Sequence, residues 1–435
     1  MPSNLAQGIR VAVVAENASF KFGGEASLPL HYFSRLRARG MDAWLIVHGR
    51  TKPELELLFP DEQDRILYIP DRWFHKLIWK MSRPLPRRVS EATFGTLMVL
   101  INQWIQRAMV KKLVGEHGVN LVHQPIPVSP KAPSFLSGLG VPVIIGPMNG
   151  GMDYPAAFRT SESLFTRITV AVGRASANGI NQIVPGKKNA KILLVANPRT
   201  RQALPSCVQG EVVEIPENGV DLCLWTLPFE YPAPSQLESK DQRNYRDQIK
   251  STAPRFLFVG RLVDWKRLDF VLHALVRLPD AQLEVIGDGA MRATWTELAE
   301  QLGIAQRVQF IGWLPQPDCV DHLHRATALV LPSIYECGGA VVLEAMATGI
   351  PAIATNWGGP AEYIDESCGI LVDPTSAETI VDGFTVAMQK LAGDPELRVR
   401  LGQAGREKVE KLYDWNRKID HILEIYRQAV DTVRS

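Results

Sequence analysis

The stretch TALVLPSIYECGGAVVLEAMATGIPAIAT (327–355) decides the fold of this 435-residue chain. TALVLP (327–332) is a short apolar run, typical of a strand that is buried on both faces. Residues 333–339 form a glycine-containing turn, Ala340–Ala347 is a helical segment, and IPAIAT (350–355) is a second buried strand. A strand, helix and strand in this order predict two parallel strands joined by a crossover helix.

The same alternation extends outward on both sides. Four further strand candidates of the C-terminal half are RFLFVG (255–260), QLEVIG (282–287), RVQFIG (307–312) and CGILVD (368–373). The candidates of the N-terminal half are Ile9–Ala15, Ala43–Val47, Ile66–Ile69, Leu121–His123, Val141–Ile145, Lys191–Val195 and Val212–Ile215. Helical segments separate most of them, such as Glu25–Arg39 before Gly40. The sequence therefore predicts an α/β fold with two Rossmann-like, doubly wound domains that face a cleft.

The domain boundaries follow from this pattern. We predict an N-terminal domain over 1–222 and a second domain over 255–410. Residues 223–254 lie between them and contain Pro228, Pro232, Pro234 and Pro254 among many charged residues, so we interpret them as a linker or exposed insertion.

Composition excludes disordered, collagen-like and disulfide-scaffold proteins. Apolar residues make up 46% and charged residues 22% of the chain, which is ordinary for a globular protein. The 48 Lys and Arg nearly balance the 46 Asp and Glu, so charge gives no support for nucleic-acid binding. The five cysteines are scattered without a CxxC pair, which favours a reducing compartment and no zinc ribbon.

The sequence also bears on location. The N-terminal MPSNLAQGIRVAVVAE lacks the pattern of a signal peptide, and no apolar run reaches the ~18 residues of a membrane span. We expect a cytoplasmic protein that can contact the inner face of a membrane. Residues 65–88 carry seven Lys and Arg against one acid, with Trp73, Phe74 and Trp79 between them, and FGTLMVLINQWI (94–105) follows. This composition suits an anionic membrane surface, and the alternative is an amphipathic helix that covers the sheet.

The strongest chemical signal lies in the turn and helix of the opening stretch. Glu336 follows the strand and faces the expected cleft, whereas Glu344 lies within the helix. Gly338 and Gly339 allow a ligand to approach the backbone, and the free N–H groups of the helix start suit a phosphate. The alternative is that Glu336 caps the helix and Glu344 is solvated.

Three weaker signals also lie at strand ends. Arg261 and Lys266 of GRLVDWK (260–266) flank a turn where two cations suit a diphosphate leaving group, although they can also be surface cations. Gly23 and Gly24 of KFGGE (21–25) allow phosphate or sugar to approach, but the turn is not GxGxxG, so a nicotinamide or flavin site is poorly supported. His123 ends the strand NLVHQP (120–125); a single histidine of this kind is more often structural.

Together these motifs resemble the retaining GT-B glycosyltransferases of family 4, the group 1 type. The resemblance covers nearly the whole chain, and its most specific part is the E-x7-E signature formed by Glu336 and Glu344. It also includes the GRL…K element, the FGG turn and ENGVD (217–221). Two departures concern the loops: Cys337 and Gly338 stand where the family often has Pro and Phe, and Gln124 stands where an acidic residue often follows the histidine.

The resemblance implies a role for each matching residue. Glu344 would bind the ribose, Glu336 the donor sugar, and Arg261 and Lys266 the diphosphate. The backbone at Cys337, Gly338, Gly339 and Ala340 would contact sugar and phosphate, and that near Gly312 and Trp313 would face the base. Gly23 and Gly24 would lie against the diphosphate or the acceptor, and His123 near the transferred sugar, either as a base or as a positioning residue. A C-terminal helix over 411–435 would pack back on the N-terminal, acceptor-side domain.

The expected reaction is the transfer of a sugar from a nucleotide diphosphate sugar, by default a UDP-sugar, with retention of configuration. No D-x-D motif occurs, so we expect no obligatory metal and no cofactor. We expect a lipid-linked or envelope glycan precursor as acceptor, and a soluble small acceptor is the alternative. A GT-B epimerase, a phosphorylase and a non-catalytic nucleotide-sugar binder are the competing functions. Loss of turnover but not of nucleotide binding in Glu336→Ala would separate the enzyme from the binder.

Overall fold

The computed structural model describes residues 8–82, 94, 96–161, 177–227 and 253–434. Two compact units divide the chain. Unit 1 contains residues 1–151, 162–218 and 416–435, and unit 2 contains residues 152–161 and 219–415. Most of the expected linker, residues 228–252, lies outside the described residues.

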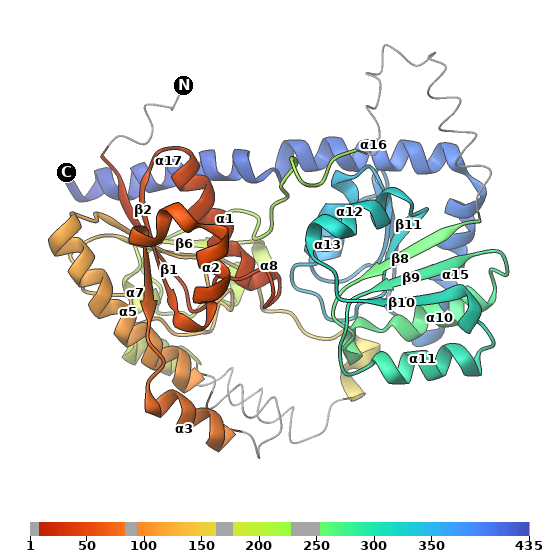
Figure 1. Cartoon of the computed structure of the whole chain (residues 1–435), viewed down its shortest axis with the longest axis horizontal. Coiled ribbons are helices and arrows are strands. Elements are labelled where there is room, and N and C mark those ends of the chain that lie inside the picture. The colour runs from red at the N-terminus through yellow and green to blue at the C-terminus, as the bar shows by residue number, and fades with distance from the viewer. Residues whose placement is uncertain (1–7, 83–93, 95, 162–176, 228–252, 435) are drawn as a thin grey trace, which may run out of the picture. The chain divides into compact units, whose positions relative to one another are not determined.

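Unit 1 is built on a seven-stranded parallel sheet with the order β3-β2-β1-β4-β5-β6-β7. Its strands are Arg10–Val14, Asp42–His48, Ile66–Ile69, Leu121–Gln124, Val143–Met148, Ile192–Val195 and Glu211–Glu214. All seven overlap the strands expected from the sequence, and their ends differ by up to three residues, as in β5 against the predicted Val141–Ile145. The central strands are buried along nearly their whole length and are mostly apolar, because helices cover a parallel sheet on both faces, as Figure 1 shows.

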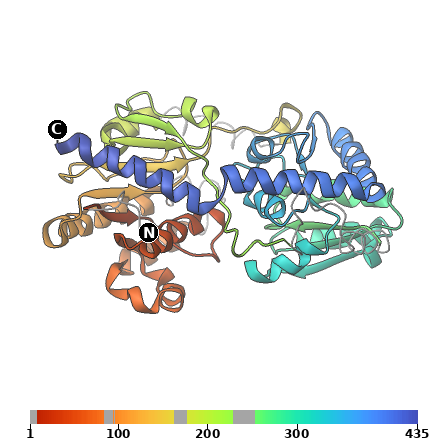
Figure 2. The ribbon, with the colours of Figure 1, turned by 90° about the horizontal axis from the view of Figure 1, so that it is seen from above.

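The helices of unit 1 connect these strands. They are α1 (Gly24–Ala38), α2 (Lys52–Leu58), α3 (Trp73–Ser82), α5 (Thr96–His117), α7 (Gly186–Asn189) and α8 (Pro198–Gln202), with η2 (Gly49–Thr51) and η3 (Pro60–Arg65). The last helix, α17 (Trp415–Arg434), lies along unit 1 in Figure 2. Arg39 of the α1 C-cap fixes it by an ion pair of 3.0 Å with Asp420. The C-terminal helix returns to the N-terminal unit as expected, but it begins at Trp415 and not at residue 411, because α16 extends to Leu412.

Unit 2 has a six-stranded parallel sheet with the order β10-β9-β8-β11-β12-β13. Its strands are Arg255–Val259, Gln282–Ile286, Val308–Gly312, Ala328–Leu331, Ala352–Thr355 and Gly369–Val372. The helices are α10 (Leu268–Val276), α11 (Arg292–Gln301), α12 (Gln316–His324), α13 (Ala340–Ala347), α14 (Gly359–Tyr363), α15 (Ala377–Gly393) and α16 (Pro395–Leu412), with η7 (Asp264–Lys266) and η8 (Ala305–Arg307). Both sheets therefore have the doubly wound order in which ligands bind beyond the carboxyl ends of the strands.

Two observations refine the expectations for residues 65–105. The apolar segment 94–105 begins a longer helix, α5, which turns the buried Gln106 toward the sheet, where its Nε2 donates to the Ala15 carbonyl at 2.7 Å. Within the described ranges, no helix is long and apolar enough to cross a membrane. Arg83, Arg87 and Arg88 of the basic stretch lie outside the described residues.

Candidate donor and acceptor sites

The turns after β8 and β11 bring Lys266 and Glu336 together. Lys266 ends the short helix η7, and Glu336 lies in the turn that leads into α13. The two turns are joined by a backbone hydrogen bond of 3.0 Å from Ile334 N to the carbonyl of Trp265. The Lys266 ammonium donates to Glu336 Oε2, and both side chains are largely but not fully buried. A cation and a carboxylate are therefore held side by side at the edge where parallel sheets bind ligands.

Glycines form the adjoining edge of the sheet. Gly260 follows β8, Gly287 follows β9 and Gly312 ends β10, and all three have positive φ. Gly287 N donates to the Gly312 carbonyl at 2.7 Å, and a Cβ on Gly287 would lie 2.0 Å from the carbonyl oxygen of Gly260. A Cβ on Gly260 would lie 3.5 Å from Lys266 Nζ, so the lysine passes over bare backbone.

A second glycine pair supports the turn that carries Glu336. Gly359 N donates to the Glu336 carbonyl at 2.8 Å, and a Cβ on Gly359 would lie 2.1 Å from the carbonyl oxygen of Gly338. Gly358 is equally close to Glu336, because its Cβ would lie 2.2 Å from that same carbonyl. Only glycines allow the turn after β12 to approach the turn after β11 this closely. The sequence contains this pair in NWGGP, but its spacing alone predicts no role for the two glycines.

The helix α13 begins where the resemblance requires a phosphate-facing helix start. Gly339 is its N-cap, with a left-handed φ of 73°, and no side chain caps the helix. The first residue of the helix is Ala340, as expected from the sequence. The helix α16 packs closely against the end of α13, since a Cβ on Gly402 of α16 would lie 1.9 Å from the Gly349 carbonyl. The free N–H groups at the start of such a helix favour an anion.

Glu344 lies in α13 and is partly buried. Gln316 Nε2, at the start of α12, donates to Glu344 Oε1 at 3.2 Å. Burial raises the pKa of Glu344 to about 7, although the hydrogen bond from Gln316 lowers it. The carboxyl is therefore partly protonated at neutral pH. No local sequence pattern marks Gln316 as a partner of Glu344, because the two residues are 28 positions apart.

The remaining predicted donor residues lie in the same unit. Arg261 directly follows Gly260 and is exposed, and it has no ion-pair or hydrogen-bond partner in the part of the chain that the structure describes. Trp313 follows β10 and is 57% exposed, which leaves its ring available to a ligand. Cys337 is partly exposed in the Glu336 turn. In the described ranges, no group of three His, Cys, Asp or Glu side chains is placed to hold a metal ion.

The KFGGE turn lies in unit 1, beside a small hollow. Gly23 has a φ of 100° and is the N-cap of α1, again without a capping side chain, and Gly24 is the first residue of the helix. The hollow has a volume of about 170 Å³ and is lined by residues after β1, β4 and the glycine turn, including Glu16, Asn17, Phe22 and Glu25. Glu25 Oε1 accepts a hydrogen bond of 3.0 Å from the N–H of Val128. Asn17 Oδ1 is buried and has no partner among the described residues.

His123 occupies the interior of unit 1. Its side chain is fully buried, because β4 continues to Gln124 and α17 covers it. The Nε2–H donates to the Gly146 carbonyl at 2.6 Å, so Nδ1 is the acceptor for the hydroxyl of Tyr426, also at 2.6 Å. Burial lowers the pKa of His123 to about 4, and the ring is neutral at pH 7. In this arrangement both ring nitrogens bind protein groups.

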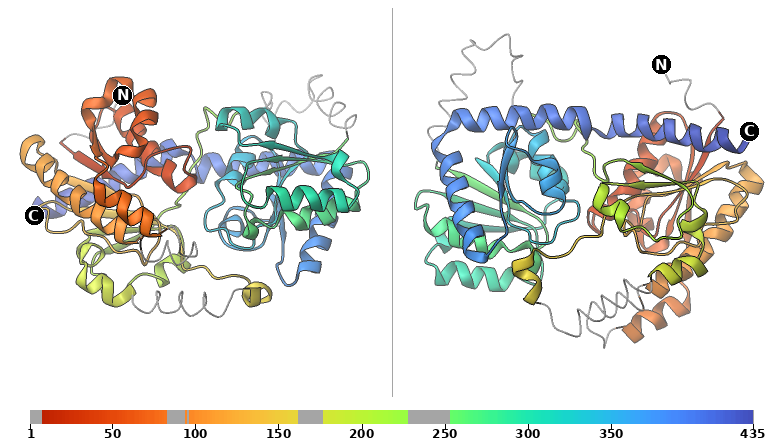
Figure 3. Two further views of the ribbon diagram at one scale, coloured as in Figure 1. Left: turned by 60° about the horizontal axis from the view of Figure 1, so that its bottom comes forward. Right: turned by 180° about the vertical axis from the view of Figure 1, so that it is seen from behind.

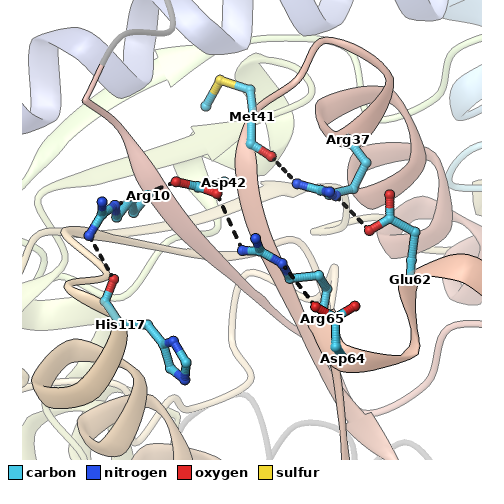
Figure 4. A network of polar contacts seen from close by, with 8 residues as sticks. All are labelled: Arg10, Arg37, Met41, Asp42, Glu62, Asp64, Arg65 and His117. Carbon is cyan, nitrogen blue, oxygen red and sulfur yellow. Dashed lines mark hydrogen bonds and ion pairs between the residues drawn. The ribbon is translucent and has the colours of Figure 1, made fainter.

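The basic stretch 65–88 is partly used for structure. Figure 4 shows Arg65 beside Asp42, at 3.3 Å, in a network that also pairs Arg37 with Glu62 at 2.8 Å. The Arg65 guanidinium also lies 4.6 Å from the centre of the Trp44 ring. Arg65 therefore stabilises the amino-terminal edge of the first sheet and is not a free surface cation.

Comparison with known proteins agrees with this arrangement. Residues 240–408 match the family described as "Glycosyl transferases group 1". The lipopolysaccharide core biosynthesis glycosyltransferase LpsE of Rhizobium meliloti is 36% identical over 156 residues, which cover 36% of this chain and 44% of LpsE. Glycogen synthase of Mycobacterium tuberculosis is 28% identical over 222 residues, or 50% of this chain and 49% of that protein. The chain thus spans about half the length of the curated relatives it matches.

Solved structures match over nearly the whole chain and show its fold. A glycosyltransferase from Rickettsia africae has a TM-score of 0.65 at 19% identity and covers 97% of this chain and 99% of its own. Sucrose-phosphate synthase from Thermosynechococcus elongatus also has a TM-score of 0.65, at 21% identity, with 97% and 100% covered. Two doubly wound units are the GT-B architecture that these structures share, and residues 240–408 of the chain are similar to the group 1 glycosyl transferases.

Proposed function

We propose that the chain transfers a sugar from a nucleotide diphosphate sugar to a hydroxyl acceptor, with retention at the anomeric carbon and without an obligatory metal. The observation that carries this proposal is the contact of Lys266 with Glu336 over the glycine edge of the second sheet. The named relatives support the class, since LpsE is described as a glycosyltransferase.

The charges of unit 2 account for bond cleavage. When the bond between the anomeric carbon and the diphosphate breaks, negative charge develops on the leaving group. Lys266, the exposed Arg261 and the start of α13 provide positive charge and N–H donors for that leaving group. These groups supply the charge that a divalent cation supplies in other transferases, and addition of EDTA should leave turnover unchanged.

Glu336 and Glu344 receive different hydroxyls in this proposal. Glu344, held by Gln316, accepts from the ribose, and Glu336 accepts from the donor sugar once Lys266 turns toward the phosphates. UDP is the proposed nucleotide because a solved structure with this fold, HepE of Anabaena, is described in complex with UDP. A mannosyltransferase of Corynebacterium glutamicum that is 30% identical over 209 residues is described as GDP-mannose-dependent, so GDP is the competing base.

The acidic hollow of unit 1 favours an acceptor over a diphosphate at the KFGGE turn. Glu16 is paired with Arg50 at 2.5 Å, so Glu25 is the carboxylate that would repel a phosphate, whereas the oxygens of both residues can accept hydrogen bonds from sugar hydroxyls. The exposed Phe22 adds an apolar ring beside these acceptors. We therefore propose that Gly23 and Gly24 lie against the acceptor, and that the acceptor end that enters the hollow is an uncharged sugar, as in a lipid-linked or envelope glycan precursor.

His123 acts as a positioning residue in this proposal. Its neutral ring has both nitrogens occupied, by the Gly146 carbonyl and the Tyr426 hydroxyl, so it holds the irregular part of β5 against α17. The acceptor proton then has to leave through the donor phosphate, as front-face attack allows.

We also propose that α3 meets an anionic membrane surface. Trp73, Leu77 and Met81 recur every fourth residue along one side of the helix and are 75%, 47% and 52% exposed. The exposed Lys80 lies among them. Vesicles with anionic lipid should bind the protein more tightly than neutral vesicles, and Trp73→Ser should weaken this. Equal sedimentation with both vesicle types would contradict an electrostatic contact.

The decisive experiment is a calorimetric titration of the full chain with UDP, GDP and ADP in the presence of EDTA, followed by turnover of the matching nucleotide sugars. Glu336→Ala should keep nucleotide binding and lose transfer, whereas Lys266→Ala should lose both diphosphate affinity and transfer. Asp382→Asn is the matched control, because Asp382 forms an exposed ion pair with Arg277 on α10's C-cap. Full transfer activity in Glu336→Ala would refute the site.

A further inference from the structure

A short segment of the N-terminal half packs against the donor site of unit 2. Residues 152–161, here called the strap, follow Gly151 of unit 1 but belong to unit 2 by their contacts. The strap ends in η5 (Ala156–Ser161), the yellow turn that lies beside unit 2 in Figures 1 and 3. Nothing in its sequence, MDYPAAFRTS, indicated this location.

The first contact of the strap lies behind the Glu336 turn. Trp357 Nε1 donates to the Asp153 carbonyl at 2.8 Å. A Cβ on Gly358 would lie 2.7 Å from Met152 Sδ on one side and 2.2 Å from the Glu336 carbonyl on the other. Gly358 is therefore enclosed between the strap and the backbone of Glu336.

The second contact lies one residue before Glu336. The rings of Tyr154 and Tyr335 have centres 4.8 Å apart and are tilted by 31°. Aromatic pairs at this distance attract each other beyond the area they bury. Tyr154 thereby restricts the position of Tyr335, which is bonded directly to Glu336.

The third contact lies one residue after Lys266. Arg267 is, in the described ranges, the one non-glycine residue with positive φ, at 48°. Its guanidinium lies 3.8 Å from the ring centre of Phe270 and 5.6 Å from that of the buried Phe158 of the strap. A backbone in this strained conformation persists only where side-chain contacts hold it, and Asp269 binds the same guanidinium at 2.7 Å.

The first contact thus falls on Gly358, which touches the Glu336 backbone, and the other two fall on Tyr335 and Arg267, the chain neighbours of Glu336 and Lys266. We propose that the strap positions Lys266 and Glu336 for the diphosphate and sugar of the donor, with Tyr154 and Phe158 as positioning residues that act through Tyr335 and Arg267. This inference rests on the proposed function. Glu344 and Trp313, which would meet the nucleoside, have no contact with the strap among the interactions described above.

The test separates the two halves of the nucleotide. Affinities for UDP, GDP and ADP are measured by calorimetry on the full chain, and those for uridine, guanosine and adenosine by saturation-transfer NMR. Tyr154→Ala and Phe158→Leu should weaken the diphosphate that binds by about three- to tenfold and leave its nucleoside unchanged. Tyr154→Phe and Phe158→Tyr retain the rings and should restore the affinity. Ala157→Ser, at an exposed position of the strap, is the matched control.

Each outcome decides a different point. An equal loss for nucleoside and diphosphate would show that the strap only stabilises unit 2, and unchanged affinity for both would show that it does not position the pair; either result overturns the inference. If the unaltered chain bound no nucleoside diphosphate, the proposed function itself would fail, and the strap inference with it. The melting temperature of each variant identifies any variant that unfolds. If Phe158→Leu unfolds, Phe158→Tyr, which retains the ring, is compared with the unaltered chain instead.

Discussion

Glu344 should make the affinity for the donor depend on pH. Its side chain is partly buried at α13, and burial raises its pKa to about 7. In the proposed complex the ribose hydroxyls donate to this group, and an ionised carboxylate accepts both hydrogen bonds without having to place a proton of its own. The donor should therefore bind to the protein in which Glu344 is ionised. Where Glu344 is protonated, donor binding should be accompanied by loss of its proton.

The magnitude follows from the pKa of about 7. At pH 6 about one tenth of the free protein carries an ionised Glu344, and at pH 8 about nine tenths. Apparent affinity falls in proportion to the fraction that is competent to bind. The dissociation constant should thus be about tenfold larger at pH 6 than at pH 8, which corresponds to about 1.4 kcal/mol.

The assay is calorimetry with UDP-glucose and GDP-mannose between pH 5.5 and 8.5. A nucleotide sugar is chosen because it lacks the terminal phosphate of UDP or GDP, whose ionisation near pH 6 would mask that of the protein. Repetition in buffers with different heats of ionisation counts the protons released, close to one per donor at pH 6. Glu344→Gln should bind more weakly and show no pH dependence. A tenfold change that persists in Glu344→Gln, or a flat profile in the unaltered chain, would refute the reasoning.

The same pKa makes a prediction about stability. Between pH 4.5 and 7 the folded chain holds a proton on Glu344 that the unfolded chain has lost, so the free energy of unfolding falls as pH rises through this window. The loss approaches about 3 kcal/mol above pH 7. Glu344→Gln should consequently raise the free energy of unfolding at pH 8 more than at pH 4, as urea denaturation would measure.

Three other substitutions test single contacts. Gly359→Ala places a Cβ 2.1 Å from the Gly338 carbonyl, so it should cost about 1–3 kcal/mol of stability and weaken UDP or GDP binding; unchanged calorimetric titrations would show that the glycine pair does not shape the site. Tyr426→Phe leaves Nδ1 of the buried His123 without a donor and should cost about 1–3 kcal/mol in urea denaturation without altering nucleotide affinity. Lys187, whose ammonium donates to the carbonyls of Ser129 and Pro130 at 2.7 Å each, has a pKa that burial lowers to about 7. Above pH 7 the unfolded chain therefore carries a proton on Lys187 that the folded chain has lost. The free energy of unfolding, measured relative to that of Lys187→Met, should rise with pH by up to about 1.4 kcal/mol per pH unit. A difference between the two proteins that stays constant from pH 7 to 9 would contradict this.

The sheets could be predicted because each strand carries its own signal. β11 reads ALVL and β12 reads AIAT, and every one of these side chains is buried. A parallel strand covered on both faces is predominantly apolar, so a run of four or five mostly apolar residues between polar turns indicates such a strand. Both ends of the helix Ala340–Ala347 were predicted to the residue, because Gly339 marks its start and Gly349 lies just beyond its end.

The interior contacts of the site could not be predicted in this way. Gln316 holds Glu344 across 28 residues, and Tyr426 holds His123 across 303 residues. Neither Gln316 nor Tyr426 interrupts the hydrophobic periodicity of its own helix, so the sequence pattern does not single out either residue. The strap was the hardest segment to place, since the chain before it belongs to unit 1 whereas its own residues belong to unit 2.

The glycine pair Gly358–Gly359 differs from these contacts, because sequence reasoning had the means to find it. β11 and β12 were both predicted, and consecutive strands of a doubly wound sheet usually pair, as these two do. Their carboxyl ends then lie side by side, so the turn after β12 has to meet the turn after β11, which carries Glu336. Two glycines at the start of that second turn are needed where one backbone approaches another, and the 2.8 Å bond from Gly359 N to the Glu336 carbonyl is that approach. A site prediction from sequence should therefore include the turn after the neighbouring strand as well as the turn that carries the motif.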